Sequence, residues 1–208
     1  MSDPVPIRDA ATLIVLRDKS SVLMGRRGAR AAFMPNLFVF PGGAVDKSDA
    51  RVPVSGLNDT CAERLLQKST ITPQSLAATA IRELWEETGQ IFGTQDCFAE
   101  PPDNWVSFAA QGYRPDARSL TYFARAITPK GRTRRFDARF FLADAAALVT
   151  DPDDFTRADL ELSELQWVPL DHAHEIGVPD ITKVVLAKLR MHLASGDPIK
   201  ESEMLLRI

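Results

Sequence analysis

Three glutamates lie within one short stretch of this sequence. Glu83, Glu86 and Glu87 belong to IRELWEETGQ, with Arg82 beside them. On a helix, like charges at this spacing repel by about 0.3 kcal/mol per pair, and burial adds to that penalty. A solvated acidic helix face is one explanation of the three acids. The other is a site for a hard divalent cation, Mg²⁺ or Mn²⁺, which prefers oxygen ligands, whereas zinc also takes sulfur and nitrogen.

A helix with well-marked ends is predicted to carry these acids. Residues 72–89 begin with Thr72, which can cap a helix, and Pro73, which fits its first turn, and Gly89 ends them. Because each residue advances a helix by about 100°, the three glutamates project within a sector of about 100°. Trp85 on the flank indicates that their side is partly covered. The apolar stripe faces another way, toward the predicted core, and consists of Ala77, Ala80, Ile81 and Leu84.

A glycine pair lies upstream of this helix. A strand over residues 36–46 is expected to run into a Pro-Gly-Gly turn that contains Gly42 and Gly43. Two successive glycines permit positive φ and let the backbone approach a ligand closely. Carboxylates and backbone carbonyl oxygen together suit Mg²⁺, whose remaining ligands are often substrate phosphates. Metal-assisted phosphoryl chemistry is therefore the leading hypothesis.

The rest of the pattern predicts an α/β chain with a mixed sheet flanked by helices. Strands and helices are interleaved without a strict βαβ repeat, and there is no internal repeat or low-complexity linker. Residues 1–208 are therefore expected to form one domain. Further strands are expected at residues 10–18, 21–27 (a hairpin with the first), 120–129, 134–144 and 163–173, the last leading into a helix. Further helices are expected at residues 57–69, 101–114 and 180–195.

Composition argues against several classes of protein. The net charge of −3 over 208 residues does not fit a general nucleic-acid binder. The apolar runs fall far short of the roughly 20 residues that span a bilayer, and MSDPVPIRDA lacks a signal-peptide pattern. A cytoplasmic protein that is not in a membrane is expected. The two cysteines support neither a disulfide framework nor a zinc site, and His172 and His174 suggest a surface turn.

Two segments resemble the halves of the Nudix box, the signature of a superfamily of hydrolases. RELWEETG matches its second half, and FPGGAVDKSD resembles the first, with Gly43 as the leading glycine and Asp49 in place of the usual glutamate. Gln90 occupies an aliphatic position, so Ile91 is expected to make that core contact. An insertion at residues 50–71 separates the halves, and the box tolerates it because the cost of loop closure rises slowly with length. Its position beside the glycine turn suggests a lid over the substrate.

The resemblance implies the Nudix fold, an α/β/α sandwich with a mixed β-sheet, and gives each acid a role. Glu86 and Glu87 would bind the catalytic Mg²⁺ (or Mn²⁺), Glu83 would be a further ligand or the base, and Arg82 would orient the glutamates. A backbone carbonyl of the glycine pair, Gly42 or Gly43, would complete the ligand set.

The resemblance also implies an acid from a later loop as base or extra ligand. Glu161 is the first candidate and Glu164 the second. Cationic side chains would hold the phosphates of the substrate. The candidates are Arg26, Arg30, Arg134 and Arg135, with Arg27 and Arg132 also available.

Over residues 8–175 the chain is similar to the peroxisomal coenzyme A diphosphatase branch of the superfamily and its bacterial relatives. The similarity includes FMPNLFVFPGGAVDKSD, RRFDARFFLAD and ELQWVPLDHA, although Asn36 stands where a motif of this branch has a glycine. It implies hydrolysis of coenzyme A or acyl-CoA to 3′,5′-ADP and phosphopantetheine. The alternative substrates are ADP-ribose, NADH or another dinucleotide. The C-terminal LLRI is not a peroxisomal address.

Two further possibilities remain. A ligand sensor that has lost catalysis would keep the fold, but the glutamates that decay in such proteins are intact here. The C-terminal helix could pack on its own core or on a second copy, which would make a homodimer.

Overall fold

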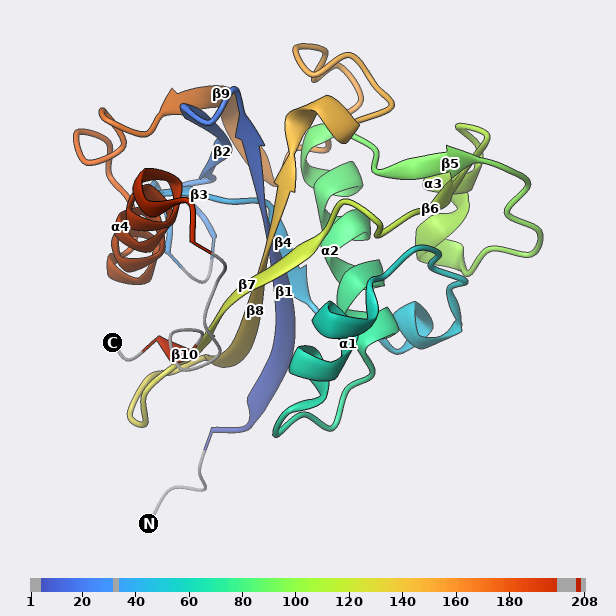
Figure 1. The fold of residues 1–208 in the computed structure, drawn as a ribbon, viewed down its shortest axis with the longest axis horizontal. Coiled ribbons are helices and arrows are strands. Elements are labelled where there is room, and N and C mark those ends of the chain that lie inside the picture. Colours follow the sequence, from blue (N-terminus) through green and yellow to red (C-terminus); the bar gives the residue numbers. More distant parts are fainter. Residues whose placement is uncertain (1–4, 32–33, 198–204, 207–208) are drawn as a thin grey trace.

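The elements of the molecule form three layers (Figure 1). A β-sheet lies between α1 (Asp59–Leu66) and α2 (Pro73–Thr88) on one side and α4 (Asp180–Ser195) on the other. This α/β/α sandwich with a mixed sheet is the predicted fold. The computed structural model describes residues 5–31, 34–197 and 205–206. The expectations about targeting signals rest in part on residues outside these ranges, 1–4 and 207–208.

Within the described residues, eight strands form the main sheet, in the order β10-β7-β8-β1-β2-β3, with β4 also paired to β1 and β9 to β2. β1 is antiparallel to β2 and β4 but parallel to β8, which makes the sheet mixed. A smaller sheet, which the pattern did not predict, joins β5 (Gly93–Gln95) to β6 (Tyr113–Pro115). The strands of the main sheet are β1 (Ile7–Arg17), β2 (Ser21–Arg27), β3 (Phe38–Val39), β4 (Gly42–Ala44), β7 (Thr121–Ile127), β8 (Arg135–Asp144), β9 (Leu162–Pro169) and β10 (Leu205–Leu206).

β1 lies inside the sheet because its middle is apolar on both faces. Leu13, Ile14 and Val15 are all fully buried, as expected of a strand that is covered on both sides. β1 forms the predicted hairpin with β2, and β2 has the predicted boundaries. The ends of β7 and β8 agree with the prediction to within two residues.

α2 forms as its sequence predicts. The Thr72 hydroxyl accepts the N–H of Ser75, Pro73 occupies the first turn, and Gly89 ends the helix in the left-handed conformation with φ of 73°. Every residue of the predicted apolar stripe is fully buried. The opposite side is also largely covered: Glu87 is buried, and Glu83 and Glu86 are partly buried.

The glycine pair departs from expectation. The predicted strand over residues 36–46 is interrupted at Pro41, and the glycines belong to a second short strand, β4, rather than to a turn. Pro41 has no N–H for a sheet ladder, but its carbonyl accepts the N–H of Leu13 at 2.9 Å. β4 then runs along β1, with Gly43 opposite Ala11.

Two other predictions are corrected in extent. The helix expected over residues 101–114 is only a 3₁₀ turn (Asp103–Trp105) followed by α3 (Val106–Ala109), because the chain then enters β6. The helix expected directly after β9 begins only at α4, and His172 and His174 lie exposed in the turn between them, as predicted.

The insertion at residues 50–71 packs into the domain and does not project as a lid. Val52, Cys61 and Leu65 are buried in the main core, the last two on α1. Arg125 Nη1 on β7 donates to the Gln67 carbonyl at 2.9 Å, which fixes the end of the insertion to the sheet. The segment therefore forms part of the helical layer beside α2.

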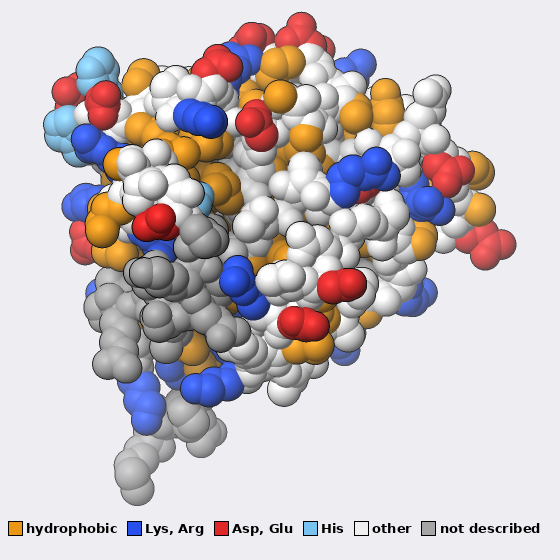
Figure 2. Space-filling model, in the orientation of Figure 1, with side chains coloured by type: hydrophobic (Ala, Val, Ile, Leu, Met, Phe, Trp, Pro, Cys, Tyr) orange, Lys and Arg blue, Asp and Glu red, His pale blue; other side chains and the backbone are white. Residues whose placement is uncertain are grey.

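The described part of the chain contains no helix that is both long and apolar enough to cross a membrane. On the face shown in Figure 2, acidic and basic side chains are interspersed over the surface.

Candidate active site

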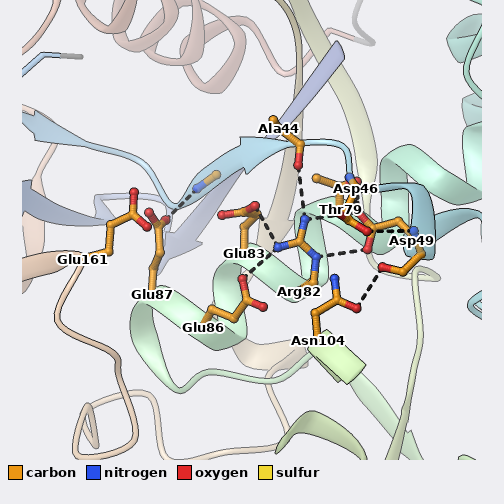
Figure 3. A network of polar contacts seen from close by, with 12 residues as sticks. Ala44, Asp46, Asp49, Thr79, Arg82, Glu83, Glu86, Glu87, Asn104 and Glu161 are labelled. Carbon is orange, nitrogen blue, oxygen red and sulfur yellow. Dashed lines mark hydrogen bonds and ion pairs between the residues drawn. The ribbon is translucent and has the colours of Figure 1, made fainter. Parts of the chain in front are cut away.

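Arg82 lies at the centre of a polar network in the C-terminal half of α2 (Figure 3). Its Nη1 donates to Glu86 at 2.8 Å and lies 2.9 Å from Glu83. Its Nη2 donates to the carbonyl of Ala44 at 3.2 Å, and Nε and Nη2 meet the carboxylate of Asp49 at 3.0 and 3.1 Å. Although burial opposes the charge, the hydrogen bonds that Arg82 donates to Asp49 and the charge of Glu83 raise the pKa of Arg82, so it stays cationic.

Asp49 holds Arg82 from the far side. It is 1% exposed and also accepts hydrogen bonds from Thr79 Oγ1 at 2.8 Å and Trp105 Nε1 at 3.1 Å. Because the segment carrying it packs directly on α2, the shorter aspartate reaches the guanidinium where the signature has a glutamate. Aspartate in place of glutamate at this position therefore still forms an ion pair with Arg82.

Glu87 is the most buried glutamate of the cluster, at 1% exposed. Its Oε2 accepts the backbone N–H of Gly42 at 2.8 Å, whereas Oε1 is buried and accepts no hydrogen bond from any residue that the structure describes. Arg27 Nη1 lies 4.0 Å from Oε1, beyond hydrogen-bond distance. A buried carboxylate oxygen is costly to leave unpaired, and a hard cation is the partner that suits it, with Glu83 and Glu86 alongside.

The charges of these glutamates are poorly compensated by the protein alone. Burial raises the pKa of Glu83 to about 7, although Arg82 opposes the shift. Burial also raises the pKa of Glu86, and burial with repulsion from Glu83 raises that of Glu87 well above its usual range. Glu87 is 1% exposed and the Glu83 side chain 13% exposed, so the cluster is not a fully solvated helix face.

The donor set fits Mg²⁺ in type, but its side chains point to protein partners. Among the described residues, no three acidic, histidine or cysteine side chains form a preassembled metal site. Glu83 and Glu86 turn toward Arg82, and Glu87 turns toward Gly42. Side-chain rotation would be needed for the three to face one ion.

The two glycines of β4 lie where an added side chain would meet close neighbours. A Cβ on Gly43 would overlap the Glu83 carboxylate, and one on Gly42 would lie 2.6 Å from the carbonyl oxygen of Ala11. The glycine pair therefore brings backbone against the carboxylates from a strand, through the Gly42 N–H, and the contribution of a glycine carbonyl to a ligand set stays a prediction.

The segment before β9 brings two more acids to the cluster. Glu161 accepts a hydrogen bond from Arg27 Nη2 at 2.8 Å and lies close enough to raise the pKa of Glu83 by repulsion, beside larger effects (Figure 3). Asp159, which the sequence did not single out, donates its backbone N–H to the carbonyl of Glu86 at 2.8 Å. Burial and the neighbouring Glu161 raise the pKa of Asp159.

The arginines at the end of β2 lie on this side of the molecule. Arg26 donates to Glu164 at 2.9 Å, and both side chains are about half exposed. Glu164 is thus engaged at the surface, while Glu161 lies beside the buried acids. Arg30 is exposed in the segment after β2.

Arg134 and Arg135 are not brought to the carboxylates. Arg135 on β8 pairs with Ile7 on β1, whereas Thr12 on β1 lies opposite Gly42. At the spacing of residues in a strand, Ile7 and Thr12 are about 16 Å apart. Its Nε donates to the carbonyl of Thr128 at 3.1 Å. The parallel register of β8 on β1 places both arginines toward the other end of the sheet.

The chain matches the family model described as NUDIX domain over residues 6–189. It belongs to the Nudix family. The chain is 31% identical over 175 residues to the Caenorhabditis elegans protein named "Putative nudix hydrolase 7", a match that covers 77% of this chain and 51% of the relative. The chain therefore spans about half the length of that curated relative.

Two solved structures share the Nudix fold. The NUDIX hydrolase from Alicyclobacillus acidocaldarius matches with a TM-score of 0.65 at 27% identity, over 91% of this chain and 96% of that chain. The NUDIX domain of Shewanella oneidensis NrtR, solved with ADP ribose, matches with a TM-score of 0.51 at 14% identity, over 90% of this chain and 89% of that chain. The second likeness shows the fold alone.

The Nudix signature does not mark every residue of this site. Ile91 is buried as expected, but Gln90 before it is fully buried as well, which places a polar amide in the interior. Asp159 belongs to the acid-rich stretch DPDDFTRADLELSE, in which nothing in the spacing indicates which acid faces the helix. Arg27 was one of several available arginines, and its contacts with Glu87 and Glu161 single it out.

Proposed function

We propose that this Nudix protein is a hydrolase that depends on Mg²⁺ or Mn²⁺ and cleaves the diphosphate linkage of a nucleoside diphosphate derivative. The observation that carries the proposal is the buried Oε1 of Glu87, which accepts no hydrogen bond within the described part of the chain and has only Arg27 at 4.0 Å, beside two further glutamates whose pKa values are raised. Without a cation these groups would be a cluster of costly buried acids.

The chain supplies the ligands and their orientation. Glu86 and Glu87, with Glu83 as a third, would hold the cation, and a carbonyl of Gly42 or Gly43 would add a neutral oxygen. A cation bound there would neutralise phosphate charge and make a bound water more acidic. Arg82 keeps Glu83 and Glu86 on one side of the helix through Nη1.

Glu161 is the proposed base for the attacking water. It lies at the open side of the cluster with 53% of its side chain exposed, and Arg27 holds it from one side. A carboxylate in this position can accept a proton from a water that reaches the buried glutamates. Glu83, with a pKa of about 7, is the second candidate.

We further propose coenzyme A or acyl-CoA as the substrate, with release of 3′,5′-ADP and phosphopantetheine. Asn36, at the position where the coenzyme A branch has a glycine, has a φ of 61°. Asparagine adopts this left-handed conformation more readily than most other residues, so the backbone course of a glycine is kept. The Asn36 N–H donates to the carbonyl of Arg27 at 3.0 Å, which fixes the loop beside Arg27.

ADP-ribose, NADH or another dinucleotide is the alternative. The NrtR domain was solved with ADP ribose, and another protein of this fold is a C. elegans Ap4A hydrolase, with a TM-score of 0.50 at 17% identity. Because the shared fold accommodates both ligands, the substrate has to be identified directly. Incubation with coenzyme A, acyl-CoA, ADP-ribose, NADH and dinucleoside polyphosphates, with products separated by mass, decides it. If coenzyme A is among the poorest substrates, the first proposal is wrong.

Replacement of Glu86 or Glu87 by Gln tests the cation site. Each change keeps size but removes a charged ligand, so Mg²⁺-dependent hydrolysis should fall by about a hundredfold or more. Glu63→Gln, an exposed glutamate on α1, is the matched control and should leave the rate unchanged. Activity within tenfold of the unmodified protein at both positions would contradict the assignment.

A further inference from the structure

The two acids that precede β9 at the site are carried by a segment without regular secondary structure. Residues 150–161 contain no helix or strand, yet they end with Asp159 and Glu161. A segment without ladder hydrogen bonds takes its position from side-chain contacts and from local packing. The contacts that hold residues 150–161 therefore determine where both acids lie.

The Gln90 amide provides three of these contacts. Its Nε2 donates to the carbonyls of Asp154 at 2.8 Å and Asp151 at 3.1 Å, and its Oε1 accepts the hydroxyl of Thr150 at 2.6 Å. The same hydroxyl oxygen accepts the N–H of Ile91 at 3.2 Å. Gln90 is fully buried and thus uses both ends of its amide to bind one segment.

Beyond the Gln90 contacts, close packing attaches the rest of residues 150–161 to the end of α2. A Cβ on Gly89 would lie 2.9 Å from Cβ of Arg157, so the segment rests directly on the end of α2. The Asp159 N–H donates to the Glu86 carbonyl at 2.8 Å, and Asp159 in turn accepts the N–H of Glu161 at 2.8 Å. A continuous path of contacts thus connects Gln90, next to the helix end, to the acids beside Glu86.

We infer that Gln90 is a positioning residue, which fixes residues 150–161 to the end of α2 and so holds Asp159 and Glu161 against the helix glutamates. The catalytic part of this inference rests on the proposed function. The aliphatic residue that the Nudix box has at this position could pack in the same space but could not make the three hydrogen bonds. Arg17 supports the segment from its exposed side through both oxygens of Asp153, at 2.8 and 2.9 Å.

Gln90→Met tests the inference, because methionine keeps the length and flexibility of the side chain and removes its hydrogen bonds. Amide hydrogen exchange at residues 151–161 should become at least about tenfold faster, while exchange in β1 and β8 stays unchanged. kcat should fall by about tenfold or more, because the base is no longer held in place. Gln111→Met, which removes an amide bonded to the Ser107 carbonyl at 3.2 Å, is the control and should change neither quantity.

Combination with Glu161→Gln distinguishes positioning from a general loss of structure. If Gln90 acts through this acid, the double variant should be no more than about twofold slower than Glu161→Gln alone. Fully additive losses, or faster exchange without any loss of kcat, would overturn the inference. Unchanged exchange would do so as well.

Two other results are informative: a Gln90→Met variant that does not fold, and an unmodified protein that hydrolyses none of the diphosphates. If Gln90→Met does not fold, Thr150→Val removes only the hydroxyl, and it should show the same pattern more weakly. If the unmodified protein hydrolyses none of the diphosphates, the proposed function fails, and the exchange measurement still tests whether Gln90 holds the segment.

Discussion

Arg82 and Asp49 are buried, whereas Glu83 and Glu86, which also balance the charge of Arg82, are partly exposed. Asp49 occupies Nε and Nη2, so the guanidinium cannot rotate, and Nη1 is left for Glu83 and Glu86. Removal of one member of a buried ion pair leaves an uncompensated charge, which costs about 3–5 kcal/mol. Changes at Arg82 or Asp49 would therefore combine effects on folding and chemistry, and Glu→Gln changes that leave this pair intact are cleaner probes.

The raised pKa of Glu83 predicts a pH-dependent stability in the cation-free protein. An unfolded glutamate ionises near 4.5, whereas native Glu83 keeps its proton up to about 7. Between these values the native state binds more protons, so raising the pH favours unfolding. With chelator present, the free energy of unfolding should fall by about 1–3 kcal/mol from pH 4.5 to 7 through this group.

Urea unfolding across this pH range, with and without Mg²⁺, provides the measurement. Glu83→Gln should reduce the slope, because that variant has no proton to lose at this position. Saturating Mg²⁺ should stabilise the native protein increasingly as the pH rises, since the cation and the proton compete for the same oxygens. A slope that is identical in the unmodified protein and in Glu83→Gln would show that Glu83 ionises normally.

At the scale of elements, the site is the contact between β4 and α2. The helix supplies the acids, and the two glycines of the strand bring backbone close to them. This arrangement depends on β4 pairing with β1, which fixes Gly42 opposite Thr12 and leaves the Gly42 N–H next to Glu87.

Gly43→Ala should separate function from folding. The new Cβ would overlap the end of the Glu83 side chain, which can move, so stability should change by only about 1 kcal/mol. The displaced carboxylate should weaken cation binding, and hydrolysis should fall by about tenfold or more. Titration calorimetry with Mn²⁺ and urea unfolding measure the two effects.

Gly28→Ala is the matched control for this change, because among the described residues a Cβ there would have no atom within 4 Å. Activity should be unaffected in that variant. If Gly43→Ala keeps full activity and full cation affinity, the contact between β4 and Glu83 has no role in the site.

The sequence predicted the elements whose signals are local. The cap, first-turn proline and terminal glycine of α2 lie within the helix or next to it, and the spacing of its acids follows from the helix itself. β4 was missed as a strand because its pairing with β1 is between segments far apart in the chain. The contacts of Gln90 and Asp159 at the site could not be predicted for the same reason, because their partners belong to other segments of the chain.

At the scale of the whole molecule, the insertion is part of the fold. Arg139 on the sheet is 1% exposed, and its Nη2 donates a hydrogen bond of 3.1 Å to the Ser69 hydroxyl. Arg125, also on the sheet, donates to the carbonyls of Gln67 and Lys68, each at 2.9 Å. These contacts lie near the start of α2, and the rise of a helix places Glu87 about 20 Å away. The end of the insertion therefore supports the layer that holds α2 in place and lies away from the carboxylates.

Two neighbouring leucines on α1 test this role of the insertion. Leu65 is 2% exposed and packs in the main core, whereas Leu66 is 56% exposed. Leu65→Ala should lower the free energy of unfolding by about 2–4 kcal/mol, measured by urea denaturation, and Leu66→Ala should cost less than about 0.5 kcal/mol. Both variants, once folded, should keep KM within about twofold, because neither leucine lies near the acids. A segment that opened and closed over the substrate would behave in the opposite way, with small changes in stability and large changes in KM, and that result would show that the insertion is a lid after all.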